Sequence, residues 1–406
     1  MKKYLAGAVA LFLSHSASAL ICVPYVSVNA SKLQGSWKLD DPVGGVMSKN
    51  DRLSGFGGDF FGGCDFQFGK FAVAAEFGGG VGDSRYHYDA AAASSDDKYT
   101  FNHYYAIGIL PSYDVNGQQL YVRIMAVWGK LRYETEIANH LAYQFNQYQS
   151  GGVFGLGILA PISSRFAIRN EYDYSYYSKV SKASGGSTIT WKPVRDSYMV
   201  GLNFYFMPRF DESQLKPLGH GFYLGLSGGR DIGSFERKDT SANATWTQGI
   251  NGWFGGLTTG YDHKLGSRII LGWDGQIDFS SANYKYVEHA NPTFDYNYYL
   301  RDSYALRGKF GIETSVSNEL FALGGIVWGH FKKTGGENYG RNFNTYRPGW
   351  QVGLGDEFAL SKHLSAQIEG TYAKFNSISN TGTDGGNYKW IPTDERASMS
   401  LIYTFS

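Results

Sequence analysis

Two stretches of the chain alternate strictly between apolar and polar positions. One lies near the middle, where Arg195–Phe206 reads RDSYMVGLNFYF, and the other closes the chain, where Asp394–Ser406 reads DERASMSLIYTFS. In the closing stretch every second residue from Ala397 to Phe405 is apolar or aromatic. A period of two is typical of a β-strand whose faces meet different surroundings. The pattern predicts that the chain contains its own closing strand twice.

Weaker alternation of the same kind predicts eight strands in each half. In the first half they are Cys22–Lys32, Gly55–Gln67, Phe71–Gly82, Phe101–Asp114, Gln119–Tyr133, Tyr148–Pro161, Arg165–Ser178 and Arg195–Phe206. In the second half they are Gly221–Glu236, Asn251–Lys264, Arg268–Ser280, Tyr299–Thr314, Glu319–Lys332, Pro348–Leu360, Leu364–Phe375 and Glu395–Phe405. Many strands with a weak signal each are typical of membrane-spanning β-barrels.

The predicted connections alternate between short and long. Short ones include Val115–Gln118, which carries the turn signal Asn116-Gly117, and Ile162–Ser164. Barrels of the outer membrane have short periplasmic turns and longer extracellular loops, so the alternation also predicts the orientation. The extracellular connections in which we expect surface chemistry are Leu33–Ser54, Asp83–Thr100, Ala282–Tyr298 and Lys333–Tyr346.

Landmarks recur in the same order in the two halves, which indicates an internal duplication. The matching pairs are Trp128-Gly129 with Trp328-Gly329, Gly155-Leu156-Gly157 with Gly353-Leu354-Gly355, Glu171 with Glu369, and Glu76 with Asp274. We therefore expect one repeat over residues 20–206 and another over residues 220–406. Between them, residues 207–219 read MPRFDESQLKPLG and predict a periplasmic linker.

The amino end predicts export. Lys2 and Lys3 precede the apolar run Leu5–Leu13 and the small residues Ala17-Ser18-Ala19, so residues 1–19 have the pattern of a cleaved signal peptide. The apolar run is too short to span a bilayer as a helix. Removing two lysines changes the formal net charge from +1 to −1, which argues against a nucleic-acid partner.

Each half resembles the eight-stranded outer-membrane β-barrel family that includes the opacity-type and OmpA-like membrane domains. The resemblance rests on the strand rhythm, the alternating connections and the closing strands SYMVGLNFYF and SMSLIYTF, and it covers Leu20–Phe206 and His220–Ser406. It implies an all-β fold, a transmembrane antiparallel up-and-down β-barrel, in the cell outer membrane. Membrane lipids, lipopolysaccharide and the barrel-assembly machinery are the implied partners, with Tyr403 and Phe405 as a terminal assembly signal.

The alternation also places charged residues inside the barrel. An outward Arg123 would cost about 2–4 kcal/mol at mid-membrane, so Leu120 and Trp128 of its strand face lipid instead. On the Arg165–Ser178 strand, Asn170 falls on the lipid side. The predicted interior charges are Glu76, Arg123, Arg169, Glu171 and Asp173 in the first repeat, and Asp274, Asp278, Arg307, Lys309 and Glu369 in the second.

These interior charges have two interpretations. They form either a network of ion pairs that fills a narrow barrel, or a path for ions or solutes. Inward residues such as Ala72, Met125 and Phe321 favour the filled interior. The chain could form two eight-stranded barrels or a single sixteen-stranded one, which would enclose an aqueous channel. The linker and the two complete closing strands favour two barrels.

Other motifs change this picture little. Cys22 and Cys64 fall near the periplasmic ends of neighbouring strands, where a disulfide is expected, although separate thiols or a redox or metal role are alternatives. The histidines are scattered without a ligand spacing, so we expect no metal, no cofactor and no enzymatic activity. Tyrosines at strand ends, including Tyr104, Tyr172, Tyr174, Tyr176, Tyr177, Tyr284, Tyr296 and Tyr298, predict an aromatic girdle at the membrane boundary. Lys332, Lys333 and Arg341 are expected to meet lipopolysaccharide phosphates.

Two classes of function follow. The first is a surface-interaction protein of the adhesin type, which acts through its extracellular loops. The second is a porin-type pore for small solutes, which acts through the interior charges.

Overall fold

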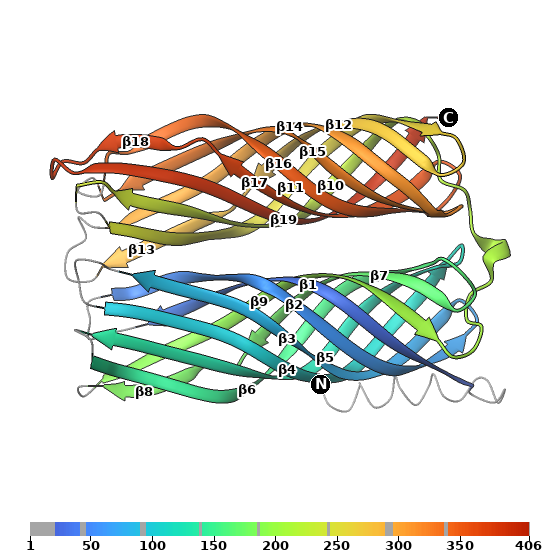
Figure 1. The fold of residues 1–406 in the computed structure, drawn as a ribbon, viewed down its shortest axis with the longest axis horizontal. Helices are drawn as coiled ribbons and strands as arrows, with labels where there is room; N and C mark the ends of the chain where they lie inside the picture. The colour runs from blue at the N-terminus through green and yellow to red at the C-terminus, as the bar shows by residue number, and fades with distance from the viewer. Residues whose placement is uncertain are drawn as a thin grey trace, which may run out of the picture.

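The computed structural model describes residues 21–40, 46–89, 95–137, 140–184, 187–241, 244–288, 295–336 and 340–405. The signal peptide predicted at residues 1–19 lies outside them. Nearly all of the described chain is β-strand, arranged as two barrels that lie side by side with parallel axes (Figure 1).

The first barrel closes on itself. Its strands are β1 (Cys22–Asp40), β2 (Val46–Phe68), β3 (Phe71–Asp89), β4 (Ser95–Val115), β5 (Gln118–Ile137), β6 (His140–Pro161), β7 (Phe166–Tyr177), β8 (Val180–Ser184) and β9 (Ser187–Tyr205). All neighbours pair antiparallel, and β1 pairs with both β2 and β9, with Tyr25 opposite Tyr205. Because β7 and β8 both pair along β9, they together form one of the eight positions in the wall.

The second barrel repeats this plan. Its strands are β10 (Gly221–Asp239), β11 (Ala244–Leu265), β12 (Ile269–Ser280), β13 (Asn283–Glu288), β14 (Tyr296–Ser315), β15 (Asn318–Gly335), β16 (Phe343–Ala359), β17 (Leu364–Phe375), β18 (Ile378–Thr381) and β19 (Asn387–Phe405). It closes where β10 pairs with β19, with Phe222 opposite Phe405. Each half is therefore a barrel of its own, and the single sixteen-stranded barrel is excluded.

A linker joins the two barrels at the end that carries the short turns (Figure 1). It contains one 3-10 turn, η1 (Glu212–Gln214), which begins after Asp211. The Asp211 carboxylate accepts hydrogen bonds from the hydroxyl and backbone N–H of Ser213 and from the side chain of Gln214. These hydrogen bonds, that from the Ser213 hydroxyl above all, hold the pKa of Asp211 below its usual value.

At the end opposite the short turns, the strands extend further than the sequence pattern predicts. The connection predicted at Leu33–Ser54, for example, is mostly strand, because β1 continues to Asp40 and β2 begins at Val46. β5 and β14 each contain 20 residues. At about 3.3 Å per residue and a tilt of about 40°, such a strand rises about 50 Å, twice the height of an apolar membrane band. The upper part of each barrel therefore projects beyond the membrane.

The outer surface of the lower part is apolar. Exposed outward side chains there include Phe60, Phe77, Ile107 and Ile124 in the first barrel and Leu224, Leu257, Leu306, Trp350 and Leu354 in the second. On the same strands Glu76, Arg123 and Arg307 point inward and are buried. An apolar band around a closed, polar-lined sheet is the surface of a membrane-spanning barrel. No helix in the described part of the chain has the length and hydrophobicity needed to cross a membrane.

Candidate functional site: charged interiors and aromatic plugs

The interior of the first barrel contains a compact cluster of ion pairs. Arg123 on β5 lies 2.5 Å from Glu171 and 2.7 Å from Asp173, both on β7. Its second terminal nitrogen lies 3.3 Å from Glu76 on β3. Arg169, two residues before Glu171 on β7, lies 2.5 Å from Glu76 and 2.7 Å from Glu171. The structure thus brings all five predicted interior charges of this repeat into one cluster, each at most 2% exposed.

Aromatic side chains complete this cluster. The Tyr121 hydroxyl donates to Glu171 at 2.7 Å, and the Tyr25 hydroxyl donates to Glu76 at 3.1 Å. The guanidinium of Arg123 lies 4.3 Å from the centre of the buried Phe61 ring. The carboxylates are thus compensated by both cations and hydroxyl donors, as charges removed from water require.

The described part of the second barrel contains three deeply buried groups of charges, besides a partly exposed one in which Glu313 lies between His220 and Lys264. Arg307 on β14 makes two hydrogen bonds with Asp274 on β12, at 2.7 and 2.8 Å, and one with Glu369 on β17, at 2.6 Å. Lys309 faces three carboxylates, those of Asp262, Glu357 and Glu319, at 2.9, 3.0 and 3.3 Å.

Arg396 forms the third group. From β19 its guanidinium lies 2.6 Å from both Asp231 and Asp278 and 2.7 Å from Asp394. Of these four residues the sequence interpretation included only Asp278. The missing signal was present in the closing strand: continuing its alternation back from Met399 places Arg396 on the inner face.

The two repeats have interior acids at matching positions, but the arginine that binds these acids comes from a different strand in each. Glu76 and Glu171 occupy positions that match Asp274 and Glu369, and in both barrels an arginine from a neighbouring wall strand contacts both acids, while in the first barrel Arg169 contacts them as well. The arginine common to both barrels comes from β5 in the first barrel and from β14 in the second. It faces a glycine across the ladder each time, Gly155 opposite Arg123 and Gly325 opposite Arg307. A glycine at this place leaves room for the large guanidinium.

Asp262, Glu319 and Glu357 are also the donor types that a hard cation prefers. Their oxygens lie within 4.8 Å of one another. The Lys309 ammonium lies among them and supplies the positive charge, so the group is a lysine ion-pair site. We assign no metal or cofactor to it.

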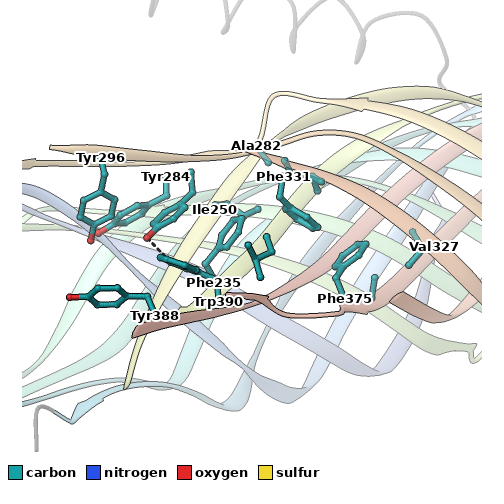
Figure 2. Packing of buried hydrophobic residues seen from close by; sticks show 14 residues of the cluster. Phe235, Ile250, Ala282, Tyr284, Tyr296, Val327, Phe331, Phe375, Tyr388 and Trp390 are labelled. Carbon is teal, nitrogen blue, oxygen red and sulfur yellow. Dashed lines mark hydrogen bonds between the residues drawn. The ribbon is translucent and has the colours of Figure 1, made fainter. Parts of the chain in front are cut away.

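Aromatic side chains plug each barrel above the charged layer. In the second barrel the rings of Phe235 and Tyr298 stack at 4.8 Å, and Trp390 donates its indole N–H to the Tyr298 hydroxyl at 2.9 Å (Figure 2). Phe331 and Phe375 pack edge to face at 4.8 Å below them. In the first barrel Trp191 packs against Tyr133 and Phe145, with ring centres 5.2 and 5.5 Å away.

The predicted aromatic girdle is therefore wrong for several tyrosines. The buried ones that point into the interior are Tyr104, Tyr177, Tyr284, Tyr296 and Tyr298, and the Tyr104 hydroxyl donates to Asp59. Tyr174 and Tyr176 remain exposed at 37% and 56%, as a girdle requires. The physical reason is that the projecting part of the wall has water outside, so its large rings are buried inside instead.

The linker closes the mouth of the first barrel at the end that carries the short turns. Phe210 packs edge to face on Tyr205 at 5.2 Å and belongs to a buried cluster with Tyr25 and Leu159. Beside it, Arg209 lies 2.5 Å from the buried carboxylate of Asp65. The first barrel is thus filled at both ends as well as in the middle.

Other predicted residues lie at the ends of the barrels. Cys22 and Cys64 are joined by a disulfide, with Cα atoms 5.4 Å apart. Tyr403 and Phe405 are 48% and 59% exposed at the end of β19. The expectation for Lys333 is wrong, because its ammonium is buried and donates to backbone carbonyls, at 2.7 Å to that of Gly335.

Together these features define the class of protein: the chain is a tandem of two eight-stranded transmembrane β-barrels with filled interiors. No protein-family model and no curated protein matches the sequence. Among solved structures, the attachment invasion locus protein Ail of Yersinia pestis, in complex with the heparin analogue sucrose octasulfate, is 16% identical with a TM-score of 0.29; the match covers 45% of this chain and 99% of that chain.

Two further solved structures are similar at the same level. Neisserial surface protein A is 14% identical with a TM-score of 0.28, over 45% of this chain and 97% of that chain. The P. putida toluene transporter TodX is 10% identical with a TM-score of 0.30, over 94% of this chain and 90% of that chain. Likenesses this weak carry no conclusion about what the present chain does.

The charged cluster predicts a large effect of Arg123 on stability. Replacing Arg123 with Leu leaves Glu76, Glu171 and Asp173 partly uncompensated, so we expect the free energy of unfolding to fall by about 3–5 kcal/mol. Reversible urea unfolding of the protein in lipid vesicles, followed by tryptophan fluorescence, measures this loss.

Arg132 is the matched control on the same strand. It also pairs with an acid, lying 2.5 Å from Glu134, but its side chain is 49% exposed. Replacing Arg132 with Leu should change the free energy of unfolding by less than about 1 kcal/mol. Equal losses for the two variants would show that the interior cluster is not tightly packed.

Proposed function

We propose that the protein is an integral protein of the bacterial outer membrane that binds extracellular partners through the projecting rims of its two barrels. The observation that carries this proposal is the filling of both interiors. Side chains occupy the barrel axis at the charged layer and at the aromatic plugs, so the interior serves as a rigid support. Binding chemistry is then left to the extracellular hairpins.

The aromatic plugs give these hairpins a firm base. A two-stranded hairpin by itself is only marginally stable in water. Here the projecting strands continue the closed ladder, and their inward rings pack against rings from the opposite wall, as Phe235 does with Tyr298 and Phe331. The described parts of the hairpins are therefore held at a defined height above the membrane. Such an arrangement suits recognition of a large partner.

The alternative of a porin-type pore has less support. Conduction would require Arg123, Arg169 and Arg307 to release carboxylates that they contact at 2.5–2.7 Å. It would also require a way around the aromatic plugs. An enzymatic role has no support from the cluster geometry, since each acid is engaged by a cation. Outer-membrane lipids and lipopolysaccharide are the proposed surroundings, and Tyr403 and Phe405 are accessible to the barrel-assembly machinery.

The filled interior predicts the absence of a large conductance. In planar bilayers the refolded protein should show no stable porin-sized open state. Liposome swelling with small sugars should stay at background for the native protein and for Arg307→Gln, because the aromatic plug remains in place in both. A steady open state in the native protein would favour the pore and would contradict the proposal.

Shortening two hairpins tests the role of the rims. Tyr86 pairs with Tyr99 on β3 and β4, so an Asn-Gly turn can replace residues 87–98 in register. Tyr133 pairs with Phe145 on β5 and β6, so the same turn can replace residues 134–144. With heparin as the immobilised probe, we expect the doubly shortened protein to lose most of the binding that the full-length protein is proposed to show.

The control for this experiment is the fold itself. The shortened protein should keep its heat-modifiable mobility in gels, since the ladder inside the membrane is unchanged. Undiminished binding by a folded, shortened protein would place the interaction elsewhere.

A further inference from the structure

Polar side chains occupy outward positions on one side of each barrel, where neighbouring outward residues are apolar. Asn170 alternates with inward Glu171 on β7, and Asp356 follows the lipid-facing Leu354 on β16. Both are nevertheless buried, at 1% and 0% exposure, because they face each other. The Asn170 amide donates to Asp356 at 2.5 Å. Lipid contact, the expectation for Asn170 from the sequence, is therefore wrong, although its outward direction is right.

Further polar contacts surround this pair. Asn318 donates to the second oxygen of Asp356 at 2.8 Å, and the Tyr198 hydroxyl donates to Asn170 at 3.4 Å. Nearer the periplasmic turns, Gln118 of the first barrel donates to Ser317 of the second at 2.9 Å. An apolar cluster from both barrels packs around them: Ile158, Ala160, Ile168, Phe358, Ala366 and Ile368.

Charged pairs continue this contact toward the extracellular side. Lys32 on β1 lies 3.5 Å from Glu395 on β19, and Arg230 on β10 lies 3.8 Å from Asp196 on β9. The Tyr172 hydroxyl donates to Asp196. In both charged pairs, Lys32–Glu395 and Arg230–Asp196, one residue comes from the first barrel and its partner comes from the second.

At the rims the contact becomes a backbone ladder. Val287 and Glu288 of β13 pair antiparallel with Ser48 and Val46 of β2. This short ladder joins the extracellular ends of the two barrels and leaves both closures intact. We name the whole contact the seam: the polar group around Asn170 and Asp356, the apolar cluster, the pairs Lys32–Glu395 and Arg230–Asp196, and the ladder.

We propose that the seam is a protein–protein interface that holds the two barrels together in the membrane without the help of the linker, each barrel being the specific partner of the other. The chemistry favours this over a lipid-filled gap. An outward Arg or Lys is unfavourable against lipid, most strongly at mid-membrane and less toward the boundary. Pairing Arg230 and Lys32 with acids of the other barrel, and Asn170 with Asp356, removes that cost only while the barrels touch.

The proposal has a consequence for specificity. The charged pairs do not provide it, because Lys32 and Arg230 stand at matching positions of the two repeats, as do Asp196 and Glu395, and each barrel supplies one cation and one acid. The pair of Asn170 and Asp356 is different, because Ile158 stands in the first barrel where the second has Asp356. Two copies of the first barrel in this geometry would set Asn170 against an apolar side chain, so this pair selects the other half over a second copy of the same half.

Cleaving the linker tests whether the seam holds. A protease recognition sequence placed after Gln214, in the exposed η1 turn, is cut in the full-length, folded protein in mild detergent. An affinity tag after the last residue then retains the second barrel. We expect the first barrel to be retained with it after cleavage. Separation of the two native halves on cleavage would overturn the proposal.

Charge reversal tests whether the charged pairs help to hold the seam. The variant Lys32→Glu with Arg230→Asp sets like charges against each other across the seam. Retention of the first barrel should fall about tenfold, which corresponds to about 1.4 kcal/mol. Adding Glu395→Lys and Asp196→Arg exchanges the charges between the barrels and should restore retention.

Two further measurements keep this test decisive. The exposed Arg132→Glu, on the outer surface of β5, is the matched control and should leave retention unchanged. Heat-modifiable mobility of each cleaved half reports that the barrels themselves remain folded. If the reversed variant, with both halves folded, is retained as well as the native protein, or the fourfold variant fails to regain retention, the charged pairs do not hold the seam.

Discussion

Closure of each sheet on itself is the constraint on which the rest of this structure depends. In a bilayer every backbone N–H and C=O must find a partner within the protein, and a strand arrangement achieves this only without free edges. β9 therefore returns to β1, and β19 returns to β10, instead of β9 pairing onward with β10. Two narrow barrels result, and a narrow barrel has an interior that side chains can fill.

What fills the interior follows from the change of surroundings along the barrel axis. Inside the membrane the outer face is apolar and the inner face carries charges, which must compensate one another because little water reaches them. Beyond the membrane the outer face meets water, so the large rings turn inward and form the plugs. The same wall thus changes from an ion-pair interior to an aromatic one as it leaves the bilayer, and neither layer leaves a wide passage.

The duplication explains how the two barrels became alike inside and complementary outside. Interior acids at matching positions bind an arginine in both halves, but the arginine comes from β5 in one and β14 in the other, each time opposite a glycine. The charges within each cluster must balance, but the strand that supplies the balancing arginine can differ. On the outer surface the charged seam residues at matching positions keep their sign, but Asp356 stands where the first barrel has Ile158, so that Asn170 finds its polar partner only in the other barrel.

Alternation along the chain determined the fold class, the two closing strands and the inward direction of Arg123, Arg307 and their acids, because a period of two is a local property of a strand. At the end opposite the short turns the alternation stops before the strands do. The outer face meets water there, so the outward residues are no longer apolar. Only the tertiary structure decided that β9 pairs with β1, that Tyr298 packs inside, and that Asn170 faces Asp356. Each of these depends on which strand or barrel lies opposite, and the local sequence of one strand does not specify its partner elsewhere in the chain.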